Sequence, residues 1–137
     1  MDKELALRVG WKLYGLPYIW GGDDPVAGFD CSGMCIEILK SVGILPREGD
    51  WTANSLYRLF NHKLDHPSAG CLVFWGNDKR MTHVEFCIDE LHTLGASGGG
   101  SKNMTREDAI RRNAYVKVRP IAGRADPKAI VNPFMDE

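Results

Sequence analysis

The sequence predicts an α+β fold, in which N-terminal helices pack on an antiparallel β-sheet formed by the second half of the chain. Apolar residues recur at helical spacing up to about residue 60, whereas short β-type runs follow from Cys71 onward. Helices followed by strands, rather than alternating with them, are typical of α+β proteins. With 137 residues, 44% of them apolar, the chain is expected to form one domain, 1–137, around a single core.

Three helices are expected in the first half of the chain. The first covers residues 2–14 and ends near Gly15, the second follows a glycine-rich loop and runs from Cys31 to about Val42, and Thr52 caps a short third helix. Their inward-facing residues are Leu5, Ala6, Val9 and Leu13, then Met34, Cys35, Ile38, Leu39 and Val42, then Leu56, Leu59 and Phe60.

Strands are expected in the second half, with a helix between the last two. The strands are 71–75, 82–89, 91–97 and 114–119. Residues 98–101 form a glycine-rich loop, and 105–108 resemble a capping box that starts a short helix. The segment 120–137 carries Pro127 and Pro133, shows no periodicity, and is expected to be an irregular C-terminal tail.

Charge and hydropathy exclude several classes of protein. Seventeen Lys and Arg against eighteen Asp and Glu give a net charge of −1, so no nucleic-acid partner is expected. No apolar run is long enough for a membrane span. The first residues, Met1–Leu5, have no signal-peptide character, which predicts synthesis in the cytoplasm and release by lysis or within a larger particle such as a virion.

The four cysteines do not indicate a disulfide framework or a zinc site. There is no Cys-x-x-Cys pair, and the spacings between cysteines and histidines match no common ligand pattern, so no metal is expected. Cys35, Cys71 and Cys87 are predicted to be small buried apolar residues.

Cys31 is the candidate nucleophile. It stands where the glycine-rich loop meets the second helix, and Asp30 directly before it is a good N-cap residue. Cys31 should therefore lie in the first helical turn, among backbone N–H groups without intrahelical partners and at the positive end of the helix dipole. A thiolate, which is the nucleophilic form of cysteine, is stabilised there.

His83 is the best candidate for the general base. It opens a strand in which His83, Glu85 and Cys87 share one face, while Val84 and Phe86 share the other. An imidazole on a strand facing a thiol on a helix is what cysteine hydrolases require. A structural, half-buried histidine is the alternative; His62, His66 and His92 are expected to be exposed.

Several motifs together resemble the NlpC/P60 peptidases, papain-like cysteine hydrolases of bacterial cell-wall peptides. The resemblance covers about residues 5–100 and implies a papain-like fold with the nucleophile helix packed on a sheet that carries the histidine. It also implies the γ-D-glutamyl–diamino acid bond of peptidoglycan stem peptides as substrate, and no cofactor. The motifs are Tyr18-x-Trp20-Gly21-Gly22, Phe29-Asp30-Cys31-Ser32-Gly33, Gly43-Ile44-Leu45-Pro46-Arg47, Gly70-Cys71-Leu72-Val73-Phe74 and His83-Val84.

The resemblance also assigns roles to residues around the nucleophile. Cys31 corresponds to the nucleophile, His83 to the general base, and Tyr18 to a tyrosine that lines the site and can donate a hydrogen bond to substrate or oxyanion. Backbone N–H groups around Cys31 and Ser32 would complete the oxyanion hole. Two alternatives are that Tyr18 is a packing aromatic beside Trp20 and that Ser32 only shapes the turn.

The third member of the triad departs from the family pattern. The family has a polar residue, often His, on the strand after the histidine, and the usual spacing arrives at Gly95, which cannot orient an imidazole. Glu85 replaces the family's small residue two positions after the histidine and would lie opposite Gly95 in the hairpin. Glu85 is therefore the hypothesis for the third member. Its alternatives are a solvated Glu85 at the rim of the site, or Ser97 or His92 in its place.

Two other functions stay open beside peptide hydrolysis. A degenerate domain could bind cell-wall peptides or serve a phage tail assembly without cleaving, and an amidase or acyltransferase could use the same Cys–His chemistry. The small domain also fits a phage-tail hydrolase with tail proteins as partners, or a recycling enzyme, or a delivered toxin.

Overall fold

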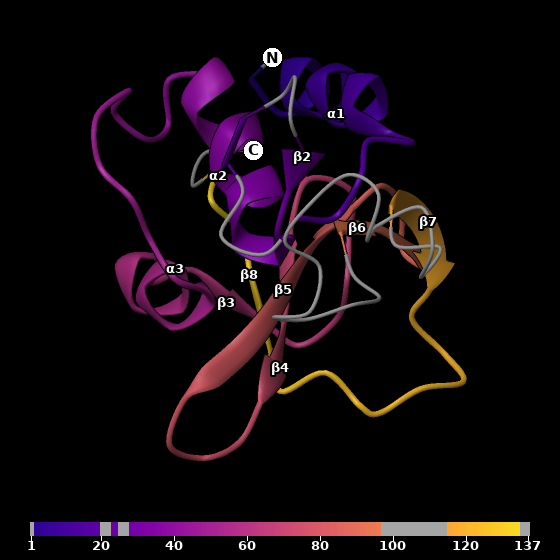
Figure 1. Cartoon of the computed structure of the whole chain (residues 1–137). Coiled ribbons are helices and arrows are strands. Elements are labelled where there is room, and N and C mark those ends of the chain that lie inside the picture. The colour runs from indigo at the N-terminus through magenta and orange to yellow at the C-terminus, as the bar shows by residue number, and fades with distance from the viewer. Residues whose placement is uncertain (1, 20–22, 25–27, 97–114, 135–137) are drawn as a thin grey trace.

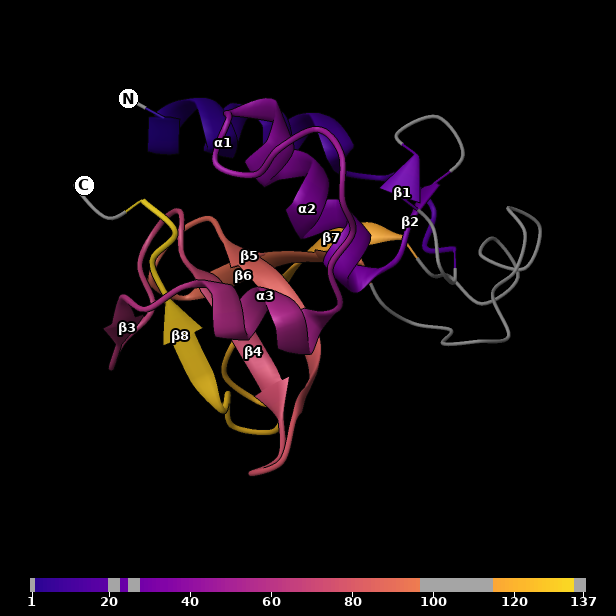
Figure 2. The ribbon, with the colours of Figure 1, turned by 90° about the vertical axis from the view of Figure 1, so that its left-hand side faces the viewer.

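A computed structural model of the chain describes residues 2–19, 23–24, 28–96 and 115–134, and it confirms the α+β class. Figures 1 and 2 show helices α1 and α2 in a layer above the sheet, with α2 nearer to it. The helices are α1 (Asp2–Leu13), α2 (Cys31–Ser41) and α3 (Ala53–Leu59). Each lies within about two residues of its predicted position, and Thr52 caps α3 through a reciprocal bond with Ser55.

The main sheet has six strands in the order β3-β8-β4-β5-β6-β7, and all its pairings are antiparallel. The strands at 71–75, 82–89, 91–97 and 114–119 were predicted with small shifts, whereas β3 and β8 were not. The observed bounds are β3 Lys63–Leu64, β4 Leu72–Gly76, β5 Met81–Cys87, β6 His92–Ala96, β7 Val116–Pro120 and β8 Ala129–Val131.

The prediction of an irregular tail over 120–137 is wrong for part of that segment. Ala129–Val131 forms β8, which lies inside the sheet between β3 and β4. A run of three residues between two prolines is too short to show a period, and its conformation is fixed by its two neighbouring strands. The C-terminal segment is thus part of the domain core.

The loop before Cys31 contains a small two-stranded sheet, β1 (Asp23–Asp24) with β2 (Gly28–Phe29), which the sequence did not indicate. The predicted helix at 105–112 lies outside the described residues. Within the described part of the chain, no helix is long and apolar enough to cross a membrane.

The apolar core lies between the helices and the sheet. Met34, Ile38 and Leu39 of α2 are fully buried against Phe74 of β4 and Phe86 of β5. A second, smaller cluster lies around the opposite side of β4 and β5, where Cys71, Val73, Cys87 and Ile130 are buried. The two clusters fix β5 from both sides, so the residues that alternate along it have well-defined surroundings.

Candidate active site

A cavity of about 490 Å³ lies at the N-terminal end of α2. One wall comes from the first turn of α2, one from the segment 50–53 that leads into α3, and one from the start of β5. Tyr18, Cys31, Ser32 and His83 all line this cavity, so the structure brings together four of the five residues predicted from the sequence.

The predicted N-cap holds Cys31 in the first turn of α2. Asp30 has extended backbone angles, and its Oδ1 accepts a hydrogen bond from the Gly33 N–H at 2.7 Å. The Met34 N–H donates to the Asp30 carbonyl. The N–H groups of Cys31 and Ser32 have no acceptor within the helix, because they precede its first turn of bonds. They are therefore the donors that an oxyanion next to the partly exposed Cys31 can use.

The backbone N–H of Ser32, rather than its hydroxyl, is the group that can donate to an oxyanion. The Ser32 Oγ donates to Asp30 Oδ1 at 3.4 Å, so the side chain is directed toward the cap. This contact favours the alternative in which the Ser32 hydroxyl shapes the turn.

His83 connects Cys31 to a carboxylate. Its Nε2–H donates to Glu85 Oε2 at 2.6 Å, and the ring lines the same cavity as Cys31, close enough for the thiol to affect its pKa. With Nε2 occupied by Glu85, Nδ1 is the nitrogen left for the thiol. Burial lowers the pKa of His83, but the interactions with Cys31 and Glu85 outweigh it and raise the pKa to about 9. This arrangement favours a protonated imidazolium beside Cys31 at neutral pH.

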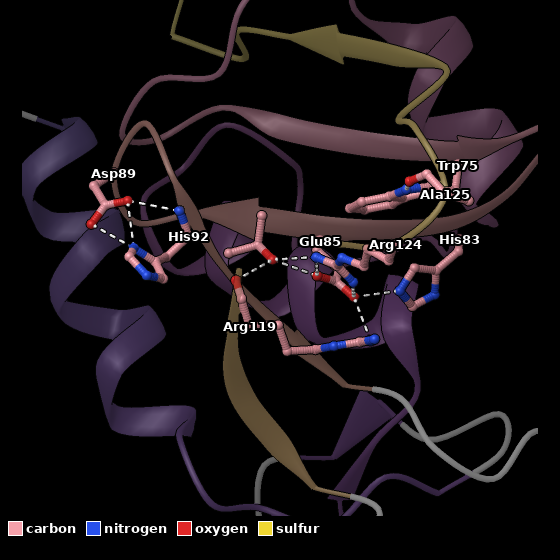
Figure 3. A network of polar contacts seen from close by, with 9 residues as sticks. Trp75, His83, Glu85, Asp89, His92, Arg119, Arg124 and Ala125 are labelled. Atoms are coloured by element: carbon pink, nitrogen blue, oxygen red, sulfur yellow. Dashed lines mark hydrogen bonds and ion pairs between the residues drawn. The ribbon is translucent and has the colours of Figure 1, made fainter. Parts of the chain in front are cut away.

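Glu85 is fully buried and carries a dense set of donors, so the alternative of a solvated rim residue is wrong. Figure 3 shows its carboxylate between His83 and two guanidinium groups. Arg124 donates to Oε1 at 2.8 Å and Oε2 at 3.1 Å, Arg119 donates to Oε2 at 3.2 Å, and Thr93 Oγ1 donates to Oε1. Burial raises the pKa of Glu85, but the bonds from His83 and Arg124 outweigh it and hold that pKa well below its usual range.

Gly95 provides the space that Glu85 occupies. A Cβ built on Gly95 would lie 2.4 Å from Cδ of Glu85, which no real contact allows. The predicted proximity of Glu85 and Gly95 is therefore confirmed. The carboxylate fills the volume in which a side chain from β6 would otherwise stand.

His92, a weaker candidate for the third member, bonds to Asp89 rather than to His83. His92 is the first residue of β6 and bonds to Asp89 through Nδ1 and its backbone N–H (Figure 3). Ser97 lies outside the described residues, as does Trp20, the proposed packing partner of Tyr18.

Tyr18 is buried beside Cys31 in the wall of the cavity. Burial, followed by the negative charges of Cys31 and Asp30, raises its pKa to about 12. The phenol therefore stays protonated at neutral pH, and Tyr18 lines the cavity beside Cys31.

The sequence did not indicate four residues that surround Glu85 and His83: Arg124, Arg119, Thr93 and Trp75. Thr93 had a signal, since it shares the period-2 face of Gly95 on β6 and so faces the same side as Glu85. Arg124 had none, because it lies in the segment expected to be irregular. Within the described residues, no group of three His, Cys, Asp or Glu side chains could hold a metal ion.

Comparisons with known proteins show the family to which the chain is similar. The profile of the NlpC/P60 family matches residues 15–119. The bifunctional muramidase/DL-endopeptidase CwlT of Bacillus subtilis is 35% identical over 101 residues, which are 71% of this chain and 30% of that protein. A γ-D-glutamyl-L-lysine dipeptidyl-peptidase of the same species is 32% identical over 100 residues, 72% of this chain and 30% of that protein.

Among solved structures, the NlpC/p60 domain of the peptidoglycan hydrolase SagA superposes with a TM-score of 0.73 at 26% identity. The superposition covers 96% of this chain and 99% of the SagA domain. The chain spans about a third of the length of the two curated relatives and almost the whole of an isolated solved domain.

Proposed function

The chain belongs to the NlpC/P60 family, and we propose that it is a cysteine endopeptidase that cleaves an amide bond in bacterial peptidoglycan stem peptides. The observation that carries the proposal is the chain of contacts from Cys31 through His83 to Glu85, at the wall of one cavity that Tyr18 also lines. Buried ion pairs contribute little to stability. A domain that did not catalyse a reaction would therefore gain little from burying the Glu85 carboxylate beside His83, and this favours a catalytic role for the pair.

In the first half of the reaction, the Cys31 thiolate attacks the amide carbonyl. The oxygen becomes negatively charged in the tetrahedral intermediate and accepts hydrogen bonds from the backbone N–H groups of the first α2 turn and from the Tyr18 hydroxyl. Protonated His83 then gives its proton to the leaving amine as the C–N bond breaks, which leaves a thioester on Cys31.

In the second half, a water molecule replaces the amine. Neutral His83 takes a proton from the water, the hydroxyl adds to the thioester carbonyl, and the Cys31–carbonyl bond breaks to release the acid. Glu85 keeps one tautomer of His83 in place and stabilises the imidazolium, the role of the third member in a triad.

For the substrate we propose the bond between γ-D-glutamate and the diamino acid of the stem peptide. Support comes from the names of the relatives, which include a γ-D-glutamyl-L-lysine dipeptidyl-peptidase and a DL-endopeptidase. A phage-tail setting stays a prediction from sequence organisation.

The test is incubation of the purified protein with defined stem peptides and intact peptidoglycan, with products identified by mass spectrometry. Release of a fragment that begins with the diamino acid is expected, and Cys31→Ala should reduce it by about 10³-fold or more. Cys71→Ala is the matched control, because Cys71 is buried in the second cluster and should leave turnover unchanged.

Two outcomes would reject the proposal. Cleavage that persists in Cys31→Ala would assign it to a contaminant or another mechanism. A folded protein with a reactive Cys31 that cleaves no wall substrate would point instead to an acyltransferase or a binding module.

A further inference from the structure

Arg124 reaches the active site from the connection between β7 and β8. Its Nη1 and Nη2 donate to separate oxygens of Glu85, at 3.1 and 2.8 Å, and Nη2 also donates to Thr93 Oγ1 at 2.9 Å. Two parallel bonds from a planar guanidinium fix the plane of a carboxylate as well as its position, which a lysine ammonium cannot do.

Trp75 forms the platform for this arginine, as Figure 3 shows. The Arg124 guanidinium carbon lies 4.4 Å from the centroid of the Trp75 ring, and Trp75 Nε1–H donates to the carbonyl of Ala125 at 2.8 Å. Trp75 is also the cross-strand neighbour of His83, with ring centroids 5.6 Å apart. One tryptophan thus contacts both the histidine and the arginine that flank Glu85.

The two arginines bonded to Glu85 are not equivalent. Arg119 makes one contact to it at 3.2 Å, and its side chain is 33% exposed. Arg124 makes two contacts and is 18% exposed. The Nε atom of Arg124 is buried without a hydrogen-bond partner among the described residues, although buried donors are usually paired. The position of the guanidinium is therefore set by its contacts with the Glu85 carboxylate and with Trp75.

We infer that Arg124 is a positioning residue of the active site: held on Trp75, it fixes the Glu85 carboxylate in the orientation that aligns His83 with Cys31. The inference rests on the proposed function, since the alignment matters only if Cys31 and His83 react. By this inference the segment 121–128 takes part in the active site, although it is remote in sequence from Cys31 and His83.

The consequence for charge can be tested without substrate. The titratable and charged groups around His83 come from several elements. His83 faces Cys31, which belongs to α2, and Glu85, which belongs to its own strand. Glu85 in turn contacts Arg119 and Arg124 and has the buried thiols of Cys35 and Cys87 nearby. Replacing Arg124 by a neutral residue removes a cation that opposes the imidazolium and favours the thiolate. The pKa of His83 should then rise, and the pH dependence of alkylation at the neighbouring Cys31 should move to higher pH.

The experiment measures the rate of Cys31 alkylation by iodoacetamide against pH, together with kcat and KM on a stem peptide, in the full chain. Arg124→Gln should move the alkylation profile to higher pH by about half a unit or more. It should lower kcat by about 10- to 100-fold through misalignment, with KM within about twofold because Arg124 does not line the cavity.

Arg124→Lys separates charge from geometry. It keeps the cation, so the alkylation profile should stay in place, but it lacks the paired bonds, so kcat should remain reduced. Arg47→Gln is the matched control, because Arg47 is exposed and pairs only at 3.7 Å with Glu37, remote from this network; it should match the native protein in every measurement.

A folded Arg124→Gln variant with native kcat and a native alkylation profile overturns the inference. If that variant lacks a cooperative thermal transition, Arg124→Lys and Trp75→Phe take its place with the same measurements, and native values in both overturn it. If the native protein cleaves no wall peptide, the proposed function fails by itself, and the alkylation profile still decides whether Arg124 controls the Cys31–His83 pair.

Discussion

The two faces of β5 differ in what holds their side chains in place. Val84 and Phe86 point into the core beneath the helices and are fully buried among apolar neighbours. His83 and Glu85, which alternate with them, lie on the other face within a network of directed hydrogen bonds. Burial is complete for Phe86 and Glu85 alike, so burial alone does not distinguish the two faces.

The difference shows where stability and chemistry reside. Apolar packing is non-directional, so the inner face tolerates changes of similar volume and loses stability when volume is removed. A buried carboxylate requires all of its partners, and it contributes position and charge rather than net stability. We therefore expect substitutions on the inner face to change the free energy of unfolding and leave turnover intact, and those on the outer face to change turnover as well.

The largest effect on turnover within β5 is expected for Glu85→Gln. The amide keeps nearly the same shape but removes the negative charge that stabilises the imidazolium, so kcat should fall by about 10²- to 10⁴-fold. Phe86→Leu is the control on the inner face and should retain native kinetics. Measured on a stem peptide, an unchanged rate in Glu85→Gln would remove Glu85 from the mechanism.

On the inner face, Phe86→Ala should lower the free energy of unfolding by about 3–5 kcal/mol, because it leaves a cavity between β5 and α2. The folded fraction should keep the native alkylation profile of Cys31. Urea denaturation and the alkylation assay at low temperature check the two statements. A shifted alkylation profile would mean that the two faces of β5 are coupled and do not have separate roles.

Much of the fold and the nucleophile side of the site could be predicted from the sequence because local signals determine them. Asp30 before an amphipathic run places Cys31 in a helical turn, and alternation along β5 places His83 and Glu85 on one face. Gly95 opposite Glu85 followed from the length of one hairpin, which is also short-range information.

The other side of the site is assembled from distant segments, which no local pattern reveals. Arg124 lies in a segment without periodicity, and its distance from Glu85 depends on β8 entering the sheet between β3 and β4. A strand as short as Ala129–Val131 is determined by its neighbours rather than by its own propensity. Trp75 is intermediate between these cases. The sequence predicts the strand that contains Trp75, but it does not indicate that Arg124 packs on its ring.

Raising the pH should lower the free energy of unfolding through His83 on the outer face of β5, and should leave the contribution of the inner face unchanged. The pKa of His83 is about 9 in the folded protein against 6.5 ordinarily, so folding favours the protonated ring. This contribution is fully present below about pH 6.5 and is lost as the pH rises through about 9, with an upper limit of about 3 kcal/mol. Urea denaturation between pH 6 and 9 should show a decline in the native protein and in Phe86→Leu. The same slope in Glu85→Gln would contradict this origin, since that variant lacks one of the two interactions that raise the pKa.

The smallest expected effect comes from Gly95→Ala, which adds one methyl group to β6 on the outer face. Gly95 has no positive φ, so the cost arises from space: the new Cβ would stand 2.4 Å from Glu85 Cδ and 2.7 Å from Oε2, on a carboxylate that Arg124 and Thr93 hold in place. We expect about 1–3 kcal/mol of destabilisation and about a tenfold loss of kcat.

The same alanine in a Glu85→Ala background should cost almost nothing, because the clashing atoms are gone. The coupling between the two positions should then be about 1 kcal/mol or more in a double-mutant cycle of unfolding free energies. Additive effects would mean that Glu85 moves aside freely, and a carboxylate that moves freely could not hold His83. The cycle therefore measures how rigidly Glu85 is held against β6.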